Sequence, residues 1–304
     1  MTVGGLFAVW ATAFVAFAYG WWPLSLLLIV PAAGFMLRLF MMQHDCGHGS
    51  FFPHKAANDW TGRVLGVLTF TPYEYWRRSH ALHHAAAGDL DRRGLGAVDT
   101  LTVDEYRALS PLKRLGYRLY RHPVVMFGVG PAWVFFIQHR VPFGLWRERG
   151  MWVSTLGTSA VMAAVAGLAI WLLGAAPVLL IVGLTVLLTA TIGVWLFYVQ
   201  HQYEGVVWVR SDGWKPAPAA LATSSHYVLP GWLRWFTANI GIHHVHHLSS
   251  RIPYYRLPEV LRAHPELDAM SRITLGQSLR FAWLALWDER ENRLVSFRTA
   301  KAAA

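Results

Sequence analysis

The chain has 304 residues, of which 55% are hydrophobic and only 14% are charged, and its formal net charge is +10. A soluble domain averages about 25% charged residues. Charged side chains are absent from residues 1–37 and 150–203, and each run is long enough for two membrane crossings of roughly 20 residues. This pattern excludes an ordinary soluble globule and a disordered chain. With Cys46 as the one cysteine, an intrachain disulfide and a cysteine-based zinc site are excluded too.

The apolar runs predict an all-α integral membrane protein with four transmembrane helices arranged as two hairpins. The expected spans are residues 3–19, 22–40, 152–173 and 177–199. Short uncharged turns at residues 20–21 and 174–176 join the members of each pair. All 27 Lys and Arg lie at the other ends of the crossings, so the positive-inside rule places both termini in the cytoplasm. Because no basic segment precedes the first apolar run and a second apolar run follows it, we interpret the start as a retained hairpin rather than a signal peptide.

Two shorter apolar stretches, residues 64–72 and 124–137, are flanked by arginines. Segments of this length more often lie in the interface than span, so they are predicted to be interfacial helices. Residues 41–151 and 200–304 are expected to be cytoplasmic, and the second segment is expected to form a helical cap on the membrane face. No internal repeat is found, and residues 1–304 are interpreted as a single membrane domain.

Three groups of histidines show helical spacing, and we call them the first, second and third boxes. They consist of His44 and His48, of His80, His83 and His84, and of His243, His246 and His247. Residues at i, i+3 and i+4 share a helix face, and neutral imidazole is a ligand for zinc, copper, iron or nickel. No full crossing separates the first two boxes and two crossings separate the second from the third, so all three are expected at the cytoplasmic surface. His201 follows the fourth crossing and is expected at the same level.

One such pair could arise by chance, but three boxes at membrane junctions indicate a metal site. Eight or nine nitrogen donors exceed the needs of one ion, so two metals are predicted, although the donor type alone leaves zinc and copper open. Cys46 points away from the ligand face and is interpreted as a small buried residue. The isolated histidines are interpreted as solvated or headgroup-contacting; they are His54, His122, His139 and His264. The roles of His226 and His244 stay open.

With the boxes identified, the chain resembles the membrane fatty acid desaturase family from about residue 40 to residue 260. The sequence HDCGHGSFF, which begins at His44, resembles the acyl-lipid branch of plant and cyanobacterial delta-12 and omega-3 enzymes. Three further phrases resemble bacterial members of that branch. These are GDLDRRG from Gly88, FYVQHQYEG from Phe197 and NIGIHHVHHLSSRIPYYRLPEV from Asn239.

The resemblance implies an oxygen-dependent fatty acyl desaturase that introduces a cis double bond into a lipid acyl chain. It implies a non-haem centre of two iron ions ligated by the eight box histidines, and His201 occupies a place where relatives contribute a further ligand. The chain has no His-Pro-Gly-Gly haem motif, so electrons are expected from an external, ferredoxin-like donor. The expected location is the bacterial inner membrane, with the active site on the cytoplasmic side.

Further residues around the boxes are candidates for supporting roles. Tyr73, Tyr75 and Trp76 precede the second box and are candidates for the wall of a substrate tunnel, although an ordinary aromatic belt is an equal interpretation. Candidates for orienting the imidazoles by hydrogen bonds are Asp45, Asp89, Asp91 and Asn239. A loop ion pair with Arg92 and Arg93 is the alternative role for Asp91.

The positive net charge is expected to lie on the cytoplasmic side, where anionic lipid headgroups explain it. The alternative is docking of an acidic electron donor. The arginines expected to form such a docking surface are Arg251, Arg256, Arg262, Arg272 and Arg280. No segment resembles a groove-reading module, so nucleic acid is not an expected partner.

Three classes of function are alternatives to desaturation: a related di-iron enzyme, a haem protein and a transporter. A fatty acyl hydroxylase or a carotenoid ketolase built on the same boxes stays open, because hydroxylation and desaturation share the first hydrogen abstraction. A haem-carrying electron-transfer subunit requires paired histidines inside the crossings, and a metal transporter is expected to have ionisable residues near mid-membrane. The four predicted spans have neither feature.

Overall fold

The computed structural model describes residues 1–302. Contacts between residues divide the chain into two compact units, each assembled from segments that are separate in the sequence. Unit 1 consists of Met1–Arg78, Pro131–Gly193 and Trp235–Ala238. Unit 2 consists of Ser79–Gly130, Val194–Arg234 and the described residues from Asn239 onward. The single-domain organisation expected from the sequence stays a prediction.

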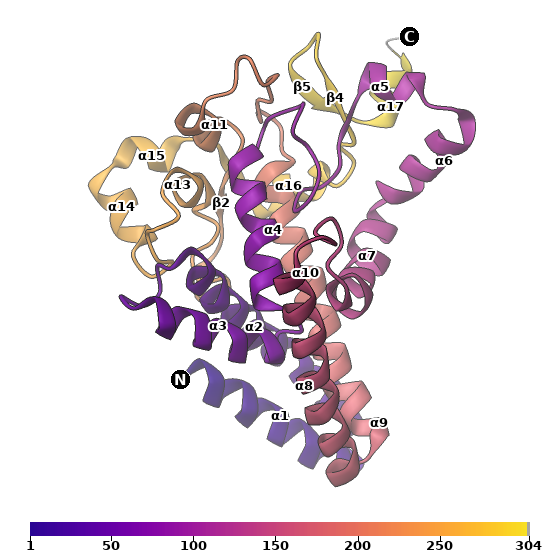
Figure 1. The fold of residues 1–304 in the computed structure, drawn as a ribbon, viewed down its shortest axis with the longest axis vertical. Coiled ribbons are helices and arrows are strands. Elements are labelled where there is room, and N and C mark those ends of the chain that lie inside the picture. Colours follow the sequence, from indigo (N-terminus) through magenta and orange to yellow (C-terminus); the bar gives the residue numbers. More distant parts are fainter. Residues whose placement is uncertain (303–304) are drawn as a thin grey trace. The chain divides into compact units, whose positions relative to one another are not determined.

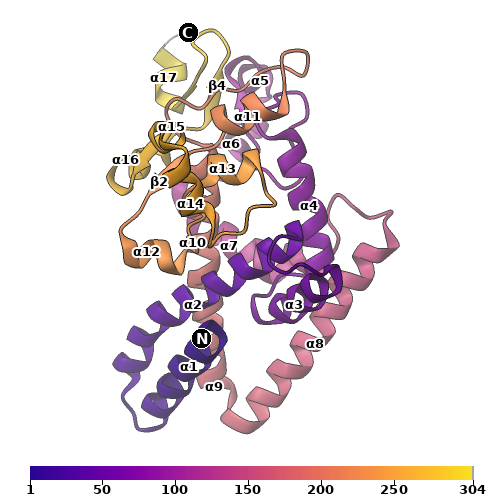
Figure 2. The same ribbon diagram turned by 90° about the vertical axis from the view of Figure 1, so that its left-hand side faces the viewer.

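Long apolar helices dominate unit 1 (Figure 2). Its elements are α1 (Thr2–Ala18), α2 (Trp22–His48), α3 (Lys55–Leu68), the first part of α4 (Tyr73–Ala86), η2 (Trp133–Ile137), η3 (Gln138–Arg140), α8 (Arg149–Leu173), α9 (Ala175–Val178), η4 (Leu179–Gly183) and the first part of α10 (Leu184–His201). The π-helical turn η4 joins α9 and α10, so the chain stays helical from Ala175 to His201.

Among residues 1–302, three helices are long and apolar enough to cross a membrane: Trp22–His48, Arg149–Leu173 and Ala175–His201. Helix α1 is apolar but has only 17 residues. The described chain is therefore mostly helical with three candidate spans, and the fourth crossing and the two-hairpin topology stay predictions. Helix α2 runs beyond its predicted end at residue 40, so the first box lies on the same helix as the span.

Helices α1 and α2 lie side by side and antiparallel in unit 1 (Figure 2). The turn between them contains Gly20 with φ of 76°, a conformation that glycine adopts without steric cost. The backbone N–H of Trp21 donates to the Ala16 carbonyl at 2.8 Å and closes the turn. A buried apolar core then joins this hairpin to α3, η4 and α10. It comprises Leu6, Trp10, Ala13, Ala32, Met36, Leu39, Leu65, Ile181 and Val186.

The end of α2 that carries the first box is fastened to the loop after α3. The hydroxyl of Thr69 donates to Gln43 Oε1 at 2.6 Å, and Gln43 Nε2 donates to the Thr71 carbonyl at 3.0 Å. Gly66 makes this approach possible, because a Cβ there would lie 2.5 Å from the Thr71 carbonyl oxygen. All these polar groups are buried, so their pairing fixes the last turns of α2.

Short helices and short strands make up unit 2, together with the C-terminal parts of α4 and α10. The elements are β1 (Leu101–Thr102), α5 (Val103–Ala108), α6 (Pro111–Tyr120), η1 (Val125–Val129), the start of α7 (Gly130–Ala132), α11 (Pro216–Ala222), β2 (His226–Val228), most of α12 (Gly231–Phe236), α13 (His243–Leu248), α14 (Leu257–Ala263), α15 (Pro265–Ala269), β3 (Arg272–Thr274), α16 (Leu275–Phe281), β4 (Leu286–Asp288), β5 (Arg293–Val295) and α17 (Phe297–Ala302). The expected cap is thus helical in part and also contains strands.

The strands form two small sheets that sequence reasoning did not predict. In one, β1 pairs in parallel with β4, and β4 pairs antiparallel with β5 in the hairpin near the C-terminus (Figure 1). In the other, β2 pairs in parallel with β3. Strands of two or three residues are too short for an alternating pattern to show. A buried cluster packs against the first sheet, and its members are Val103, Tyr106, Tyr117, Leu286, Val295 and Ala300.

The two stretches predicted as interfacial are helical over most of their length. Residues 64–68 form the end of α3, and the chain then turns at Phe70, whose φ is 58°. Residues 125–137 form η1, α7 and η2 in succession. Their location at the level of lipid headgroups stays a prediction.

Candidate metal centre

Four histidines of unit 2 converge in what we call the four-histidine cluster. His83 comes from α4, His201 from the end of α10, and His243 and His247 from α13. One nitrogen from each residue lies within 4.8 Å of the nitrogens of all the others. The Nε2 atom of His201 lies 3.1 Å from Nε2 of His83 and 3.0 Å from Nε2 of His243. Nε2 of His247 lies 3.1 Å from Nε2 of His243.

The hydrogen bonds of His201 define which nitrogen faces the cluster with a lone pair. Its Nδ1 lies 3.0 Å from the Thr223 carbonyl oxygen, which only accepts hydrogen bonds, so Nδ1 carries the proton. In the neutral ring Nε2 is then unprotonated. Imidazole lone pairs directed at one point are stable when they share a cation. Nitrogen ligands at about 2.1 Å from a metal lie about 3 Å from one another, and the Nε2 spacings fit this arrangement.

Burial keeps the imidazoles of the cluster in the form that binds metals. The side chains of His83 and His243 are buried. Burial lowers the pKa of His247 well below its usual value, and the neighbouring imidazoles at His84 and His243 lower it further. His247 is therefore neutral near pH 7, and a neutral imidazole binds a metal without first losing a proton.

Three more histidines of unit 2 form a second group, the three-histidine cluster. Nε2 of His84 lies 3.1 Å from Nε2 of His80 and 3.2 Å from Nε2 of His246. The two clusters adjoin each other, because the rings of His84 and His247 are stacked with centroids 4.0 Å apart. Helices α4 and α13 contribute to both clusters, as expected for i, i+3 and i+4 spacing on each helix.

The two histidines of the first box lie together at the end of α2 in unit 1, with ring centroids 4.7 Å apart. Nδ1 of His44 lies 3.0 Å from a carboxylate oxygen of Asp45. A carboxylate on Nδ1 holds the proton there and leaves Nε2 for a metal. Of the four proposed orienting residues, Asp45 is the one whose carboxylate lies within hydrogen-bond distance of an imidazole among residues 1–302.

The other proposed orienting residues hold loops of unit 2. The carboxylate of Asp91 accepts hydrogen bonds from Arg210 at 2.7 Å and from the backbone N–H of Ser211 at 3.0 Å. Asp89 is buried and accepts from the Ser211 hydroxyl at 2.9 Å. The amide of Asn239 donates to the Tyr254 carbonyl at 3.2 Å. Asp91 thus holds a loop, but its ion-pair partner is Arg210 and not the predicted Arg92 and Arg93, which pair with Asp89 and Glu105.

The candidate tunnel residues lie in unit 1. The hydroxyl of Tyr73 donates to the Cys46 carbonyl at 2.8 Å, and the hydroxyl of Tyr75 donates to the Phe143 carbonyl at 3.0 Å. Both tyrosines are buried, and burial raises the pKa of each phenol. The ring of Trp76 packs on His44 with centroids 5.5 Å apart. Trp76 is thus the member of the trio in contact with a box histidine, and a tunnel wall stays a prediction.

The histidines outside the boxes differ among themselves. His54, His122 and His264 are exposed, as expected. The same expectation was wrong for His139, which is buried because the Phe70 carbonyl and the rings of Tyr75 and Phe135 surround it.

His244, left open by the sequence, belongs to neither cluster. Its Nε2 lies 2.8 Å from the Leu267 carbonyl oxygen, and burial lowers its pKa to about 4. Sequence reasoning also missed the Thr223 and Ser225 carbonyls, which bind His201 and the start of α13. Main-chain acceptors leave no signal in residue type.

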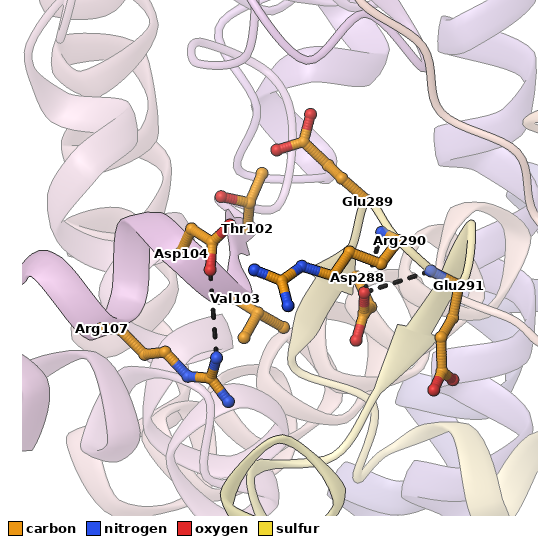
Figure 3. A pocket seen from close by; sticks show the side chains of 8 residues that line it. All are labelled: Thr102, Val103, Asp104, Arg107, Asp288, Glu289, Arg290 and Glu291. Atoms are coloured by element: carbon orange, nitrogen blue, oxygen red, sulfur yellow. Dashed lines mark hydrogen bonds and ion pairs between the residues drawn. The ribbon is translucent and has the colours of Figure 1, made fainter. Parts of the chain in front are cut away.

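A cavity of about 220 Å³ in unit 2 is separate from this chemistry. It lies between α5 and the β4–β5 turn, where the Arg290 side chain extends toward Asp104 (Figure 3). Its lining residues are Thr102, Val103, Asp104, Arg107, Asp288, Glu289, Arg290 and Glu291. No histidine lines this cavity, so it is not part of the metal centre.

Long apolar helices and clustered neutral imidazoles together define a membrane-associated protein with sites suited to a transition metal. Comparison of the sequence with family models identifies the particular class. The model described as "Fatty acid desaturase" matches residues 5–278. The chain belongs to the fatty acid desaturase family, and it is an enzyme of the oxidoreductase class. The predicted family is confirmed.

Individual relatives support this assignment. The chain is 42% identical over 295 residues to a fatty acid desaturase of Bacillus subtilis (strain 168), covering 97% of this chain and 83% of that protein. It is 27% identical over 253 residues to an sn-1 acyl-lipid omega-3 desaturase (ferredoxin) of Synechocystis, covering 82% and 67%. It is 24% identical over 291 residues to an sn-1 oleoyl-lipid 12-desaturase of Anabaena variabilis, covering 87% and 76%.

Proposed function

We propose that this chain is an oxygen-dependent acyl-lipid desaturase that uses two histidine-bound iron ions to introduce a cis double bond. The observation that carries the proposal is the four-histidine cluster of unit 2, in which one ring nitrogen of each histidine lies within 4.8 Å of those of the others. Such a donor set suits a metal ion, because nitrogen lone pairs directed at one point repel one another unless a cation lies between them. Family membership then favours iron over zinc or copper.

Each ion is assigned its own ligands. One ion would be held by the four-histidine cluster, His83, His201, His243 and His247. The second would be held by the three-histidine cluster with His44 and His48 added from the first box. Three imidazoles fill half of an octahedral coordination shell, and the two histidines of the first box would bring this ion to five nitrogen ligands with one position open. The helical spacing of the first box and its family resemblance support this assignment.

When bound, the iron pair supplies the oxidising power to remove hydrogen from an unactivated methylene. In the net reaction the acyl chain loses two hydrogen atoms, one dioxygen accepts them together with two electrons and two protons, and two waters form. The residues of this chain keep the imidazoles neutral and oriented: Thr223 fixes the tautomer of His201, and Asp45 fixes that of His44. The acyl chain would pass along Tyr73, Tyr75 and Trp76, where aromatic side chains exclude water.

We infer four crossings, with α1 as the crossing that pairs with α2. Its 17 residues extend about 25 Å as a helix, slightly less than a bilayer core of about 30 Å. The uncharged turns at Gly20 and Gly174 and the lysines and arginines at the opposite helix ends support this topology. Both termini and the metal centre would then face the cytoplasm at the bacterial inner membrane.

Electrons are proposed to come from a separate ferredoxin-like protein. The name of the Synechocystis relative includes ferredoxin, and a net charge of +10 favours an acidic partner. The arginines proposed for this surface are all exposed in unit 2, namely Arg251, Arg256, Arg262, Arg272 and Arg280. Arg272 already pairs with Asp268 at 2.7 Å, so the other four are the better targets for charge reversal.

Expression in a host that lacks the product, followed by gas chromatography–mass spectrometry of its fatty acids, tests this proposal. We expect a new unsaturated fatty acid, and two irons per chain in the purified protein. Replacing His247 by Ala should abolish the product and reduce the iron content by at least half. The matched control is His264→Ala, because His264 is exposed and its Nδ1 pairs with the carboxylate of Glu266 at 3.1 Å, away from the clusters. A hydroxylated product, or full iron content in His247→Ala, would contradict the proposal.

A further inference from the structure

His244 lies among the histidines of the third box on α13 but belongs to neither cluster. His244 is fully buried, and its Nε2 lies 2.8 Å from the Leu267 carbonyl oxygen in α15. Because a carbonyl only accepts, His244 Nε2 carries a proton and donates it. A nitrogen committed in this way does not bind a metal. His244 therefore has a role different from that of its neighbours His243, His246 and His247.

A second histidine completes the contact. The rings of His244 and His226 are stacked, with centroids 5.5 Å apart and an interplanar angle of 30°. Nδ1 of His226, at the start of β2, lies 3.1 Å from the Asp268 carbonyl oxygen. The two rings thus bind consecutive carbonyls of α15, those of Leu267 and Asp268. We call this arrangement the His244–His226 clamp, and it connects α13, β2 and α15.

Helix α13 depends on such contacts because it cannot hold its own orientation. It has only six residues and no side-chain cap at its N-terminus, and helices this short are not stable alone. The N–H groups of His243 and His244 both donate to the Ser225 carbonyl, at 3.2 and 3.3 Å. The N–H of Ser225 in turn donates to the Gln200 carbonyl at 3.0 Å. Helix α13 is therefore held at two places: its first turn binds the Ser225 carbonyl, and its side is held by the His244–His226 clamp.

We propose that His244 is a positioning residue for the metal centre: by binding the Leu267 carbonyl and stacking on His226, it holds α13 so that its three other histidines face the metals. Metal ligands must be placed within about 0.5 Å for full affinity, and α13 supplies three of them. The inference rests on the proposed function, since it assumes that the third box binds metal.

Cobalt binding to the purified, metal-free protein tests this role without measuring turnover. Co²⁺ reports its ligand geometry through its visible absorption, so the affinity and the spectrum are both read. His244→Leu removes the donor and should weaken Co²⁺ binding by about 10- to 100-fold and alter the visible bands. His244→Gln retains an N–H donor near the position of Nε2 and should restore both to within about 3-fold of the original protein. His264→Leu, an exposed position, should change neither.

The outcomes separate this inference from the proposed function. If the original protein binds no stoichiometric Co²⁺, the metal assignment itself fails. If it binds Co²⁺ and His244→Leu binds it with the same affinity and spectrum, the clamp has no positioning role. His244→Gln could lose Co²⁺ binding while its unfolding temperature stays that of the original protein. That result would show that His244 is itself a ligand and would overturn the inference. If His244→Leu does not fold, His244→Asn takes its place, because its shorter amide does not reach the Leu267 carbonyl. It should then weaken Co²⁺ binding as expected for His244→Leu, and unchanged binding would again mean that the clamp has no positioning role.

Discussion

Units 1 and 2 are stabilised in different ways. In unit 1, long helices satisfy their own backbone groups, and apolar side chains such as Leu6, Met36 and Ile181 fill the core. In unit 2, elements of two to ten residues are held by bonds from side chains to distant carbonyls, such as that of Tyr117 to Ala285 at 2.7 Å. The four-histidine and three-histidine clusters lie in the second kind of structure. Long apolar segments form the candidate membrane spans, whereas the histidine clusters depend on contacts between segments far apart in the sequence.

Two arginines, one from each unit, make the same contrast. Arg121 in unit 2 and Arg140 in unit 1 have no carboxylate partner among the described residues. Arg121 is 3% exposed and donates to Gln202 at 3.0 Å and to four further neutral acceptors. Arg140 binds the Phe70 carbonyl at 2.7 Å and lies partly exposed, and burial lowers its pKa to about 10. Arg121 is the more completely enclosed of the two cations.

The largest effect is expected from removing Arg121. Arg121→Met removes the hydrogen bonds that a charged donor makes to Gln202, Thr100 and Leu284, and each such bond contributes about 1.5 to 3 kcal/mol. We expect a loss of about 3 kcal/mol in the free energy of unfolding, measured by reversible unfolding in mixed micelles. The matched control is Arg290→Met, whose side chain extends into the charged cavity (Figure 3). Equal stabilities of the two variants would show that the enclosed guanidinium does not organise unit 2.

A smaller, pH-dependent effect is expected from His139 in unit 1. Burial first, and then the neighbouring Arg140, lower the pKa of His139 to about 3, against an ordinary value of 6.5. The unfolded chain therefore binds a proton below pH 6.5 that the folded chain does not bind until about pH 3. The free energy of unfolding should fall by about 1.4 kcal/mol for each pH unit below 6.5. It should not depend on His139 above that pH.

Unfolding of the original protein and of His139→Gln between pH 7 and pH 5 measures this contribution. The original protein should lose about 2 kcal/mol more than His139→Gln over that interval. His264→Gln serves as control, because His264 is exposed and its replacement should leave the pH profile as it was. Parallel profiles for the original protein and His139→Gln would mean that burial does not lower the pKa of His139 in the folded state.

The difference between the units also explains what the sequence predicts. The charge-free runs identify α2, α8 and the helix from Ala175 to His201, because a membrane span requires only length and apolar composition. Helical spacing groups the box histidines, because i, i+3 and i+4 positions share a face. In contrast, the strands β1 to β5 are too short to show a pattern. The pairing of His244 with Leu267 depends on how α13 meets α15, and no local pattern records this.

The smallest effect is expected from a hydrogen bond in unit 1 that joins α1 to α10. The indole N–H of Trp10 donates to the Thr185 hydroxyl at 3.2 Å, and this hydroxyl donates to the Ile181 carbonyl at 2.6 Å within its own helix. In a membrane the separated helices find other partners for such groups, and measured couplings average about 0.6 kcal/mol. A double-mutant cycle with Trp10→Phe and Thr185→Val should therefore give about 0.6 kcal/mol of coupling. A coupling of about 3 kcal/mol, the loss expected for Arg121→Met, would contradict the proposal that α1 crosses the bilayer. It would mean that the separated helices find no other hydrogen-bond partners for these groups.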